Sequence, residues 1–120
     1  MFNILEKTHN NLVAIRIEGK INKKDYEDLL PVIEKKSNEH SNINMYLEFH
    51  KIEGVTPKAA LDDIMTYFKY VADFDKIAVI GEDNWGNLLE STSNAFYSAR
   101  IRFFSFNQKE QAENWIEYEA

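Results

Sequence analysis

Two loops of this 120-residue chain hold side chains suited to acid–base or metal chemistry. One follows the predicted strand "INMYLEF" and the other follows the predicted strand "KIAVIG". Ligands of parallel α/β sheets bind beyond the carboxyl ends of the strands, so we expect these loops to be neighbours. An acid–base or metal site is therefore one interpretation of four residues, His50, Glu53, Glu82 and Asp83.

A structural interpretation of the same acidic residues is the stronger one. Glu82 and Asp83 precede a predicted helix at about residues 84–98, and acids in a first turn complement the helix dipole. One histidine with scattered carboxylates is not a metal-binding motif, and the chain has no cysteine. The "GEDNWG" turn lacks the glycine spacings that cradle phosphates. We expect no cofactor, no metal and no catalytic residues.

Thr56 is the hydroxyl-bearing residue of the first loop, "EGVTP". A threonine directly before proline is typical of a helix that begins with an N-cap residue and a proline at its first position. A phosphate on Thr56 would also be favoured by the helix N-terminus, which keeps a phosphorylation switch as a second interpretation.

Aromatic residues are abundant, with eight Phe, six Tyr and two Trp. Several lie off the main apolar stripe of a predicted helix or in the segments that flank it, and they are candidates to line an apolar cleft or a partner surface: Tyr67, Tyr70, Phe74, Trp85, Phe96 and Tyr97. Rings at helical spacing are more often part of the core, which is the interpretation we favour.

The predicted elements follow the order β-β-α-β-α-β-α-β-α. The segments "FNILEKT" and "LVAIRIEG" predict a hairpin, and alternation in "INMYLEF" places Ile43, Met45, Leu47 and Phe49 on one face. Pro31 either kinks the first helix or separates two segments. The last helix is predicted to start at Asn107 and to bury Ala112, Trp115 and Ile116. This order indicates one α/β domain over residues 1–120, with a mostly parallel sheet covered by helices.

Composition excludes several classes of function. The net charge is −6 and the basic residues are not clustered, which argues against nucleic-acid binding. No segment approaches the roughly 20 apolar residues that a membrane-spanning helix needs. The first residues lack the pattern of a signal peptide, so we expect a cytoplasmic protein.

Three stretches carry a resemblance to a known family: "LLPVIEKK", "YFKYVADFDKIAVIGEDNW" and "ARIRFFSFNQKEQAENWI". Together they resemble the SpoIIAA-like family, whose broader relatives are the STAS domains. The resemblance implies a STAS-like α/β fold, no established enzyme activity, and action through partner proteins. In anti-sigma factor antagonists a phosphorylatable serine begins the helix after this strand; this chain has only Thr56 there.

The expected function is accordingly a non-enzymatic binding or regulatory domain that contacts a protein partner or a second copy of itself. Its contact residues are expected at the strand-to-helix loops: Glu53, Thr56, Glu82, Asp83 and Trp85, with Tyr67 and Tyr70 nearby. The alternative is a carrier or sensor of a small hydrophobic, lipid-like ligand held between helices and sheet.

Overall fold

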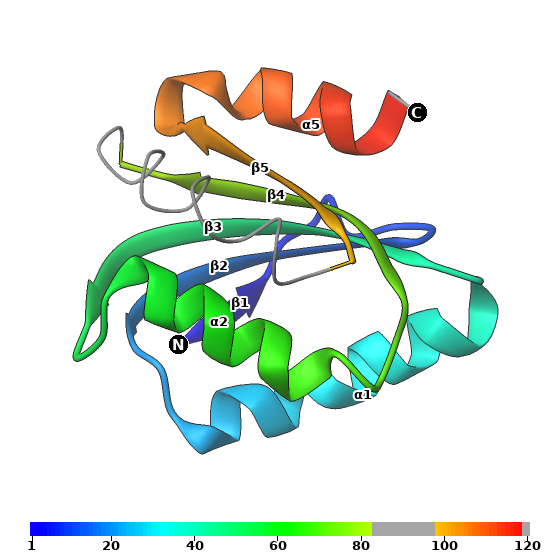
Figure 1. Ribbon diagram of the computed structural model, residues 1–120, viewed down its shortest axis with the longest axis horizontal. Coiled ribbons are helices and arrows are strands. Elements are labelled where there is room, and N and C mark those ends of the chain that lie inside the picture. The colour runs from blue at the N-terminus through cyan, green and yellow to red at the C-terminus, as the bar shows by residue number, and fades with distance from the viewer. Residues whose placement is uncertain (83–97, 119–120) are drawn as a thin grey trace.

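The computed structural model describes residues 1–82 and 98–118, which form a five-stranded sheet with helices on both faces (Figure 1). The strands and helices follow the predicted order, and their bounds are β1 Phe2–Ile4, β2 Leu12–Lys20, α1 Lys23–Glu39, β3 Ile43–Glu53, α2 Pro57–Phe68, β4 Phe74–Gly81, β5 Arg100–Ser105 and α5 Lys109–Tyr118. The helix predicted at residues 84–98 falls almost wholly outside the described residues. None of the helices in the described part is long and apolar enough to span a membrane.

Each strand pairs with its neighbour in the sequence, which gives the order β1-β2-β3-β4-β5. β1 and β2 form the predicted antiparallel hairpin, with Phe2 opposite Ile17. The other three pairings are parallel, and in the centre Leu47 of β3 lies between Ile15 of β2 and Val79 of β4. The mostly parallel α/β architecture expected from the sequence is therefore confirmed.

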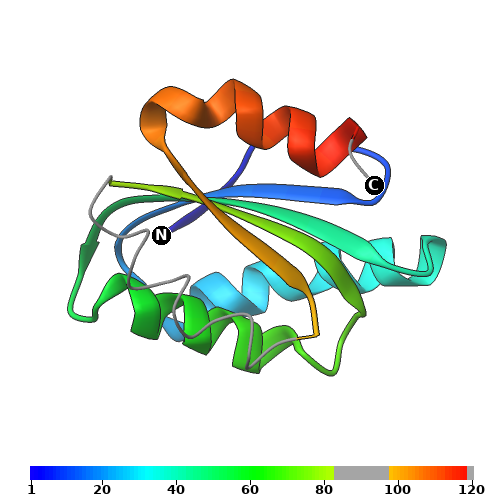
Figure 2. The same ribbon diagram turned by 45° about the horizontal axis from the view of Figure 1, so that its top comes forward.

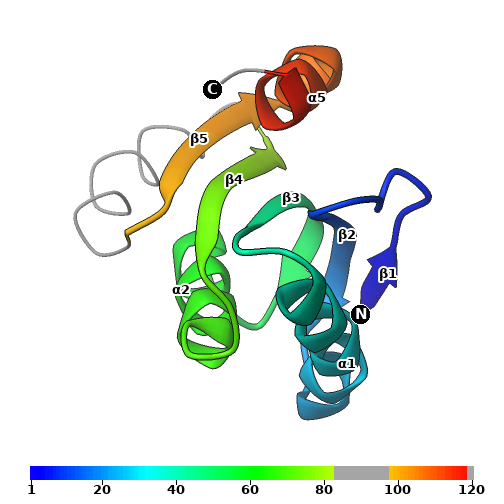
Figure 3. The ribbon, with the colours of Figure 1, turned by 90° about the vertical axis from the view of Figure 1, so that its right-hand side faces the viewer.

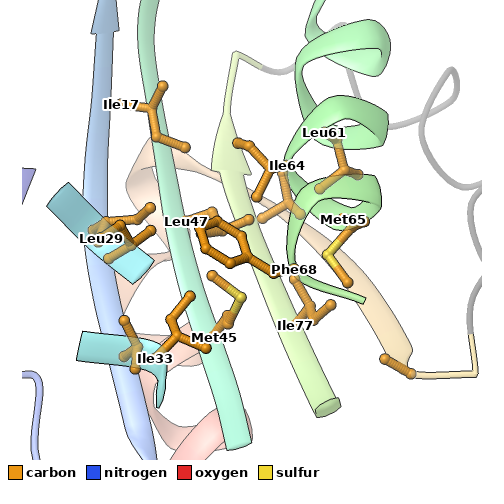
Figure 4. Packing of buried hydrophobic residues seen from close by; sticks show 14 of the residues in the cluster. Ile17, Leu29, Ile33, Met45, Leu47, Leu61, Ile64, Met65, Phe68 and Ile77 are labelled. Atoms are coloured by element: carbon orange, nitrogen blue, oxygen red, sulfur yellow. The ribbon is translucent and has the colours of Figure 1, made fainter. Parts of the chain in front are cut away.

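The larger core lies between the sheet and the pair α1 and α2, on one side of the sheet in Figure 2. Strand alternation builds it, because every second side chain points to the same face. The predicted inward residues of β3 are all fully buried: Ile43, Met45, Leu47 and Phe49. Opposite them lie apolar residues of the two helices, Leu29, Ile33, Leu61, Ile64, Met65 and Phe68 (Figure 4).

A second, smaller core lies on the other face, where α5 covers the sheet (Figure 3). The predicted residues Ala112, Trp115 and Ile116 are buried there. They pack against the alternate residues of the strands, Leu12, Ala14, Tyr46, Ala78, Ile80 and Phe104. Both faces of the central strands are thus buried, as is usual for parallel sheets.

The structure decides the question raised by Pro31. α1 is one helix from Lys23 to Glu39 with Pro31 inside it. Pro31 is exposed, so the backbone carbonyl that loses its helical partner can bond to water instead. At its start, Asn22 and Asp25 form a reciprocal capping box, with N···O distances of 3.2 and 2.9 Å.

The predicted start of the last helix at Asn107 is wrong by two residues. A short 3₁₀ helix, η2 (Phe106–Gln108), precedes α5, and its N-cap is Ser105. The side-chain oxygen Oε1 of Gln108 reaches back to accept a hydrogen bond from the backbone N–H of Ser105 at 3.0 Å. Two residue pairs have the spacing of a capping box, Ser105–Gln108 and Asn107–Glu110. Because β5 ends at Ser105 and the 3₁₀ helix begins at the next residue, Ser105 takes the N-cap position.

Candidate functional site

The corner between β3 and α2 is an exposed turn that starts from the carboxyl end of a central strand. Four consecutive residues are exposed: Glu53, Gly54, Val55 and Thr56. Thr56 caps α2, because its hydroxyl oxygen accepts a hydrogen bond from the backbone N–H of Ala59 at 3.2 Å. Pro57 occupies the first turn of the helix, as predicted. The structural role expected for Thr56 is present.

Replacing Thr56 by alanine is expected to lower the free energy of unfolding by about 1 kcal/mol, since an N-cap hydroxyl contributes roughly this amount. The serine variant should retain most of the stability. A matched control is Thr66→Ala on the exposed side of α2, which removes the same hydroxyl away from the cap. Urea unfolding of the three variants measures the effect. Equal stabilities of Thr56→Ala and Thr66→Ala would contradict the capping role.

The backbone is strained where β3 approaches the corner. Lys51 has φ 49°, a left-handed conformation that costs a non-glycine residue about 1 kcal/mol or more. Across the strand pair, Gly19 also has positive φ (63°), and the register of β2 and β3 shifts between Glu18 and Lys20. Gly54 turns the chain toward α2 with φ 86°. The two strands remain paired beyond these bends, with Lys20 opposite Glu53.

Two hollows flank the corner, and Glu53 lines both. The His50 hollow has a volume of about 530 Å³ and is lined by Met1, Glu18, Gly19, His50, Lys51 and Glu53. The Tyr26 hollow, about 220 Å³, lies between the starts of the two helices, and its lining residues include Tyr26, Val55 and Asp63. The corner therefore lies between the two hollows, and the exposed apolar side chain of Val55 lines the Tyr26 hollow.

A buried charged cluster lies beside the His50 hollow, on the face of the sheet that α5 covers. Glu48 of β3 is only 2% exposed. Its Oε2 accepts a hydrogen bond from the Tyr46 hydroxyl at 2.9 Å, and its Oε1 lies 3.0 Å from Nε2 of His50. Two cationic side chains also lie near Oε1 of Glu48. The distance to it is 3.4 Å from Nζ of Lys109 and 3.7 Å from Nε of Arg16. We call these five residues the Glu48 cluster.

The cluster favours an ionised Glu48. Burial alone raises the pKa of Glu48, but hydrogen bonds from His50 and Tyr46 and the charge of Lys109 outweigh it and hold that pKa below its usual value. Burial, followed by the charge of Glu48, raises the pKa of the Tyr46 hydroxyl, so Tyr46 stays a neutral donor. The cluster is a stable carboxylate surrounded by donors.

Sequence reasoning missed Glu48. Only its inward neighbours on β3 were predicted to be buried, because strict alternation in a single strand suggests that the other face meets solvent. A signal was available in the predicted sheet: a central parallel strand is covered on both faces, so Tyr46, Glu48 and His50 should all lie under a second layer. A carboxylate in such a position requires donors.

The described residues do not form the acid–base or metal site that was one interpretation of the two loops. His50 bonds to Glu48, and Glu82 is exposed and is not among the residues that line the His50 hollow. Within residues 1–82 and 98–118, no three His, Asp or Glu side chains are grouped so as to hold a metal ion. Asp83 lies outside the described residues.

The aromatic candidates separate into different environments. Tyr67 stacks on Tyr26, with ring centroids 4.7 Å apart, and is 39% exposed. Tyr70 is 89% exposed, whereas Phe74 packs at the border of the larger core. Three others lie outside the described residues: Trp85, Phe96 and Tyr97. Between α1, α2 and the sheet, the space is filled by the core side chains shown in Figure 4. The predicted apolar cleft remains a prediction.

Comparison with known proteins places this architecture in a family. Its fold is similar to that of an uncharacterized protein from the DUF3478 family of Shewanella loihica, described as having a SpoIIAA-like fold (TM-score 0.70, 23% identity, covering 97% of this chain and 92% of that one). It is also similar to the Bacillus cell fate determinant SpoIIAA in its phosphorylated form (TM-score 0.54, 11% identity, covering 95% and 98%).

The unphosphorylated form of SpoIIAA, an anti-sigma factor antagonist, gives a TM-score of 0.52 at 11% identity, covering 97% of this chain and 98% of that one. At these identities the neighbours establish the fold alone. No curated protein matches the chain. The profile of the SpoIIAA-like family matches residues 12–117, which include every described element except β1 and the last residue of α5. The chain belongs to the SpoIIAA-like family.

Proposed function

We propose that this chain is a single-domain, non-enzymatic binding protein of the cytoplasm that acts through protein contacts at the corner between β3 and α2. One observation carries the proposal: the corner is exposed from Glu53 to Thr56, with Val55 at 44% exposure, and it lies between two hollows. An exposed apolar side chain beside hollows suits a protein surface, where a buried apolar contact is surrounded by polar groups.

The strained backbone supports the same location. Left-handed non-glycine residues persist where the surrounding structure determines them, and they occur often at binding sites. Lys51 has this conformation and lines the His50 hollow. Glu53 is the polar residue common to both hollows, and Thr56 fixes the start of the helix behind it. We assign Val55 the central contact and Glu53 a contact at its edge.

The test uses a photoreactive phenylalanine analogue placed at Val55 in the protein's own cells. We expect a discrete cross-linked protein from position 55 and none from position 118, where Tyr118 is even more exposed and lies on the opposite face of the sheet. A product of twice the mass of the chain would identify the partner as a second copy. Absence of any product from position 55 contradicts the proposal.

Affinity measured with the purified partner then decides whether the contact is specific. Val55→Asp is expected to weaken binding at least tenfold, because it buries an unpaired charge, and Tyr118→Ser should leave binding unchanged. Equal affinities of the two variants contradict the proposed surface. Native mass spectrometry of the same preparation tests the carrier alternative, which requires a bound apolar molecule at one per chain.

A further inference from the structure

The two ends of α5 are held to the sheet by different chemistry. At its start, Lys109 lies 3.4 Å from the carboxylate of Glu48, and the ring of Phe106 packs on His50 with centroids 4.9 Å apart. At its end, the side chains of Asn44 and Lys76 donate hydrogen bonds to the last carbonyls of the helix, at 3.2 and 2.8 Å. Only the start depends on a buried carboxylate.

The groups that face Glu48 come from every neighbouring element. β2 contributes Arg16, whose guanidinium also lies 4.0 Å from Glu18. β3 itself contributes Tyr46 and His50, and α5 contributes Lys109. β4 places the apolar side chain of Ile80 opposite Glu48. If Glu48 were neutral, Lys109 would lose its partner in the cluster and Arg16 would keep only Glu18 among the described acids, so the attraction that holds the start of α5 to the sheet would be lost.

We propose that α5 can separate from the sheet while the rest of the fold stays intact. The separation begins at the N-terminal end of α5 and is controlled by the charge on Glu48. Release would expose the smaller core, an apolar face that includes Ala14, Tyr46 and Ile80, while the larger core beneath α1 and α2 stays intact. Helix α5 lies on the face of the sheet opposite α1 and α2 (Figure 3). Its release does not depend on the function proposed for the corner between β3 and α2.

The size of the two cores supports an opening of α5 alone. Among the described residues, nineteen buried side chains form the larger core, and none of them comes from α5. Nine form the smaller core, of which three belong to α5. Proteins open locally in contiguous units at free energies below that of global unfolding. Release of α5 would leave every member of the larger core in place.

Backbone hydrogen exchange with increasing urea tests the proposal on the full chain. We expect amides of residues 110–116 to have protection factors at least tenfold below those of residues 45–49 and 77–80. Their protection should also depend less on urea, because a smaller opening exposes less surface. Identical protection and identical urea dependence for α5 and the sheet would overturn the proposal, since α5 would then open only by global unfolding.

Variants test the role of Glu48. Glu48→Gln should lower the protection factors of residues 110–116 about tenfold at pH 6.5. In the wild type these protection factors should fall when the pH is lowered from 6.5 to 4, and in Glu48→Gln they should fall less. Glu110→Gln is the matched control, because Glu110 is an exposed acid in the first turn of α5. It should change protection less than threefold. If Glu48→Gln does not fold, Lys109→Met removes the same ion pair from the helix side. Unchanged α5 protection in a folded variant of either kind overturns the proposal.

Discussion

Replacement of Phe68 by alanine is expected to lower the free energy of unfolding by about 3–5 kcal/mol, the range for truncating a buried aromatic side chain. Phe68 is the last residue of α2 and is fully buried among the core side chains (Figure 4). Its ring centroid lies 6.1 Å from that of Tyr26. Its removal leaves a cavity where both helices meet the sheet, and close-packed neighbours refill such a space only in part.

Urea unfolding monitored by circular dichroism measures this loss. Tyr70→Ala is the control, because Tyr70 follows the same helix but is 89% exposed, and exposed substitutions usually change stability by less than about 0.5 kcal/mol. A loss below about 1.5 kcal/mol for Phe68→Ala would mean that the ring is not enclosed as described. An unchanged slope with urea would show that the variant keeps the native compactness.

Replacement of Glu48 by leucine is expected to cost about 3 kcal/mol at pH 7. Removing one partner of a buried ion pair costs about 3–5 kcal/mol, because the remaining groups lose their counter-charge. The lower end applies here, since Arg16 and Lys109 are about 40% exposed and can turn toward water. The Tyr46 hydroxyl, by contrast, loses a 2.9 Å hydrogen bond inside the core.

The same residue predicts a dependence of stability on pH. Because the pKa of Glu48 is lower in the folded protein than its usual value of 4.5, the stabilisation is present above about pH 4.5 and is lost as the pH falls through the folded value. The wild type should therefore lose stability below pH 4.5 more steeply than Glu48→Gln, and the difference between the two should shrink on acidification. A gap that stays constant between pH 7 and pH 3 would contradict this assignment. The control Glu110→Gln, at an exposed position of α5, should follow the wild type.

The alternation and helical spacing of apolar residues predicted most of the described fold. Met45 and Leu47 were assigned to the buried face of a strand, and Trp115 and Ile116 to the buried face of a helix, because these positions depend only on local periodicity. The start of α5 was misplaced because two overlapping segments both satisfy the capping pattern, and the end of β5 decides between them.

The candidate site was less predictable because it depends on contacts between distant segments. Thr56 was correctly identified as a helix cap from its own sequence context. The partners of Glu48, in contrast, come from β2, β3 and α5, up to 61 residues apart in the case of Lys109. No local pattern reports such an arrangement. His50, which one interpretation grouped with Glu53, Glu82 and Asp83, contacts Glu48.

The sequential strand order has a consequence for how the protein is made. Each strand pairs with the one that precedes it in the chain, so a ribosome that has released β4 has already supplied every pairing partner from β1 to β4. The face formed by Leu12, Ala14 and Tyr46 must nevertheless wait for α5, the last described helix. A nascent chain of this protein therefore displays a nearly complete sheet with one bare apolar side, the form in which chaperone binding or aggregation is most favoured.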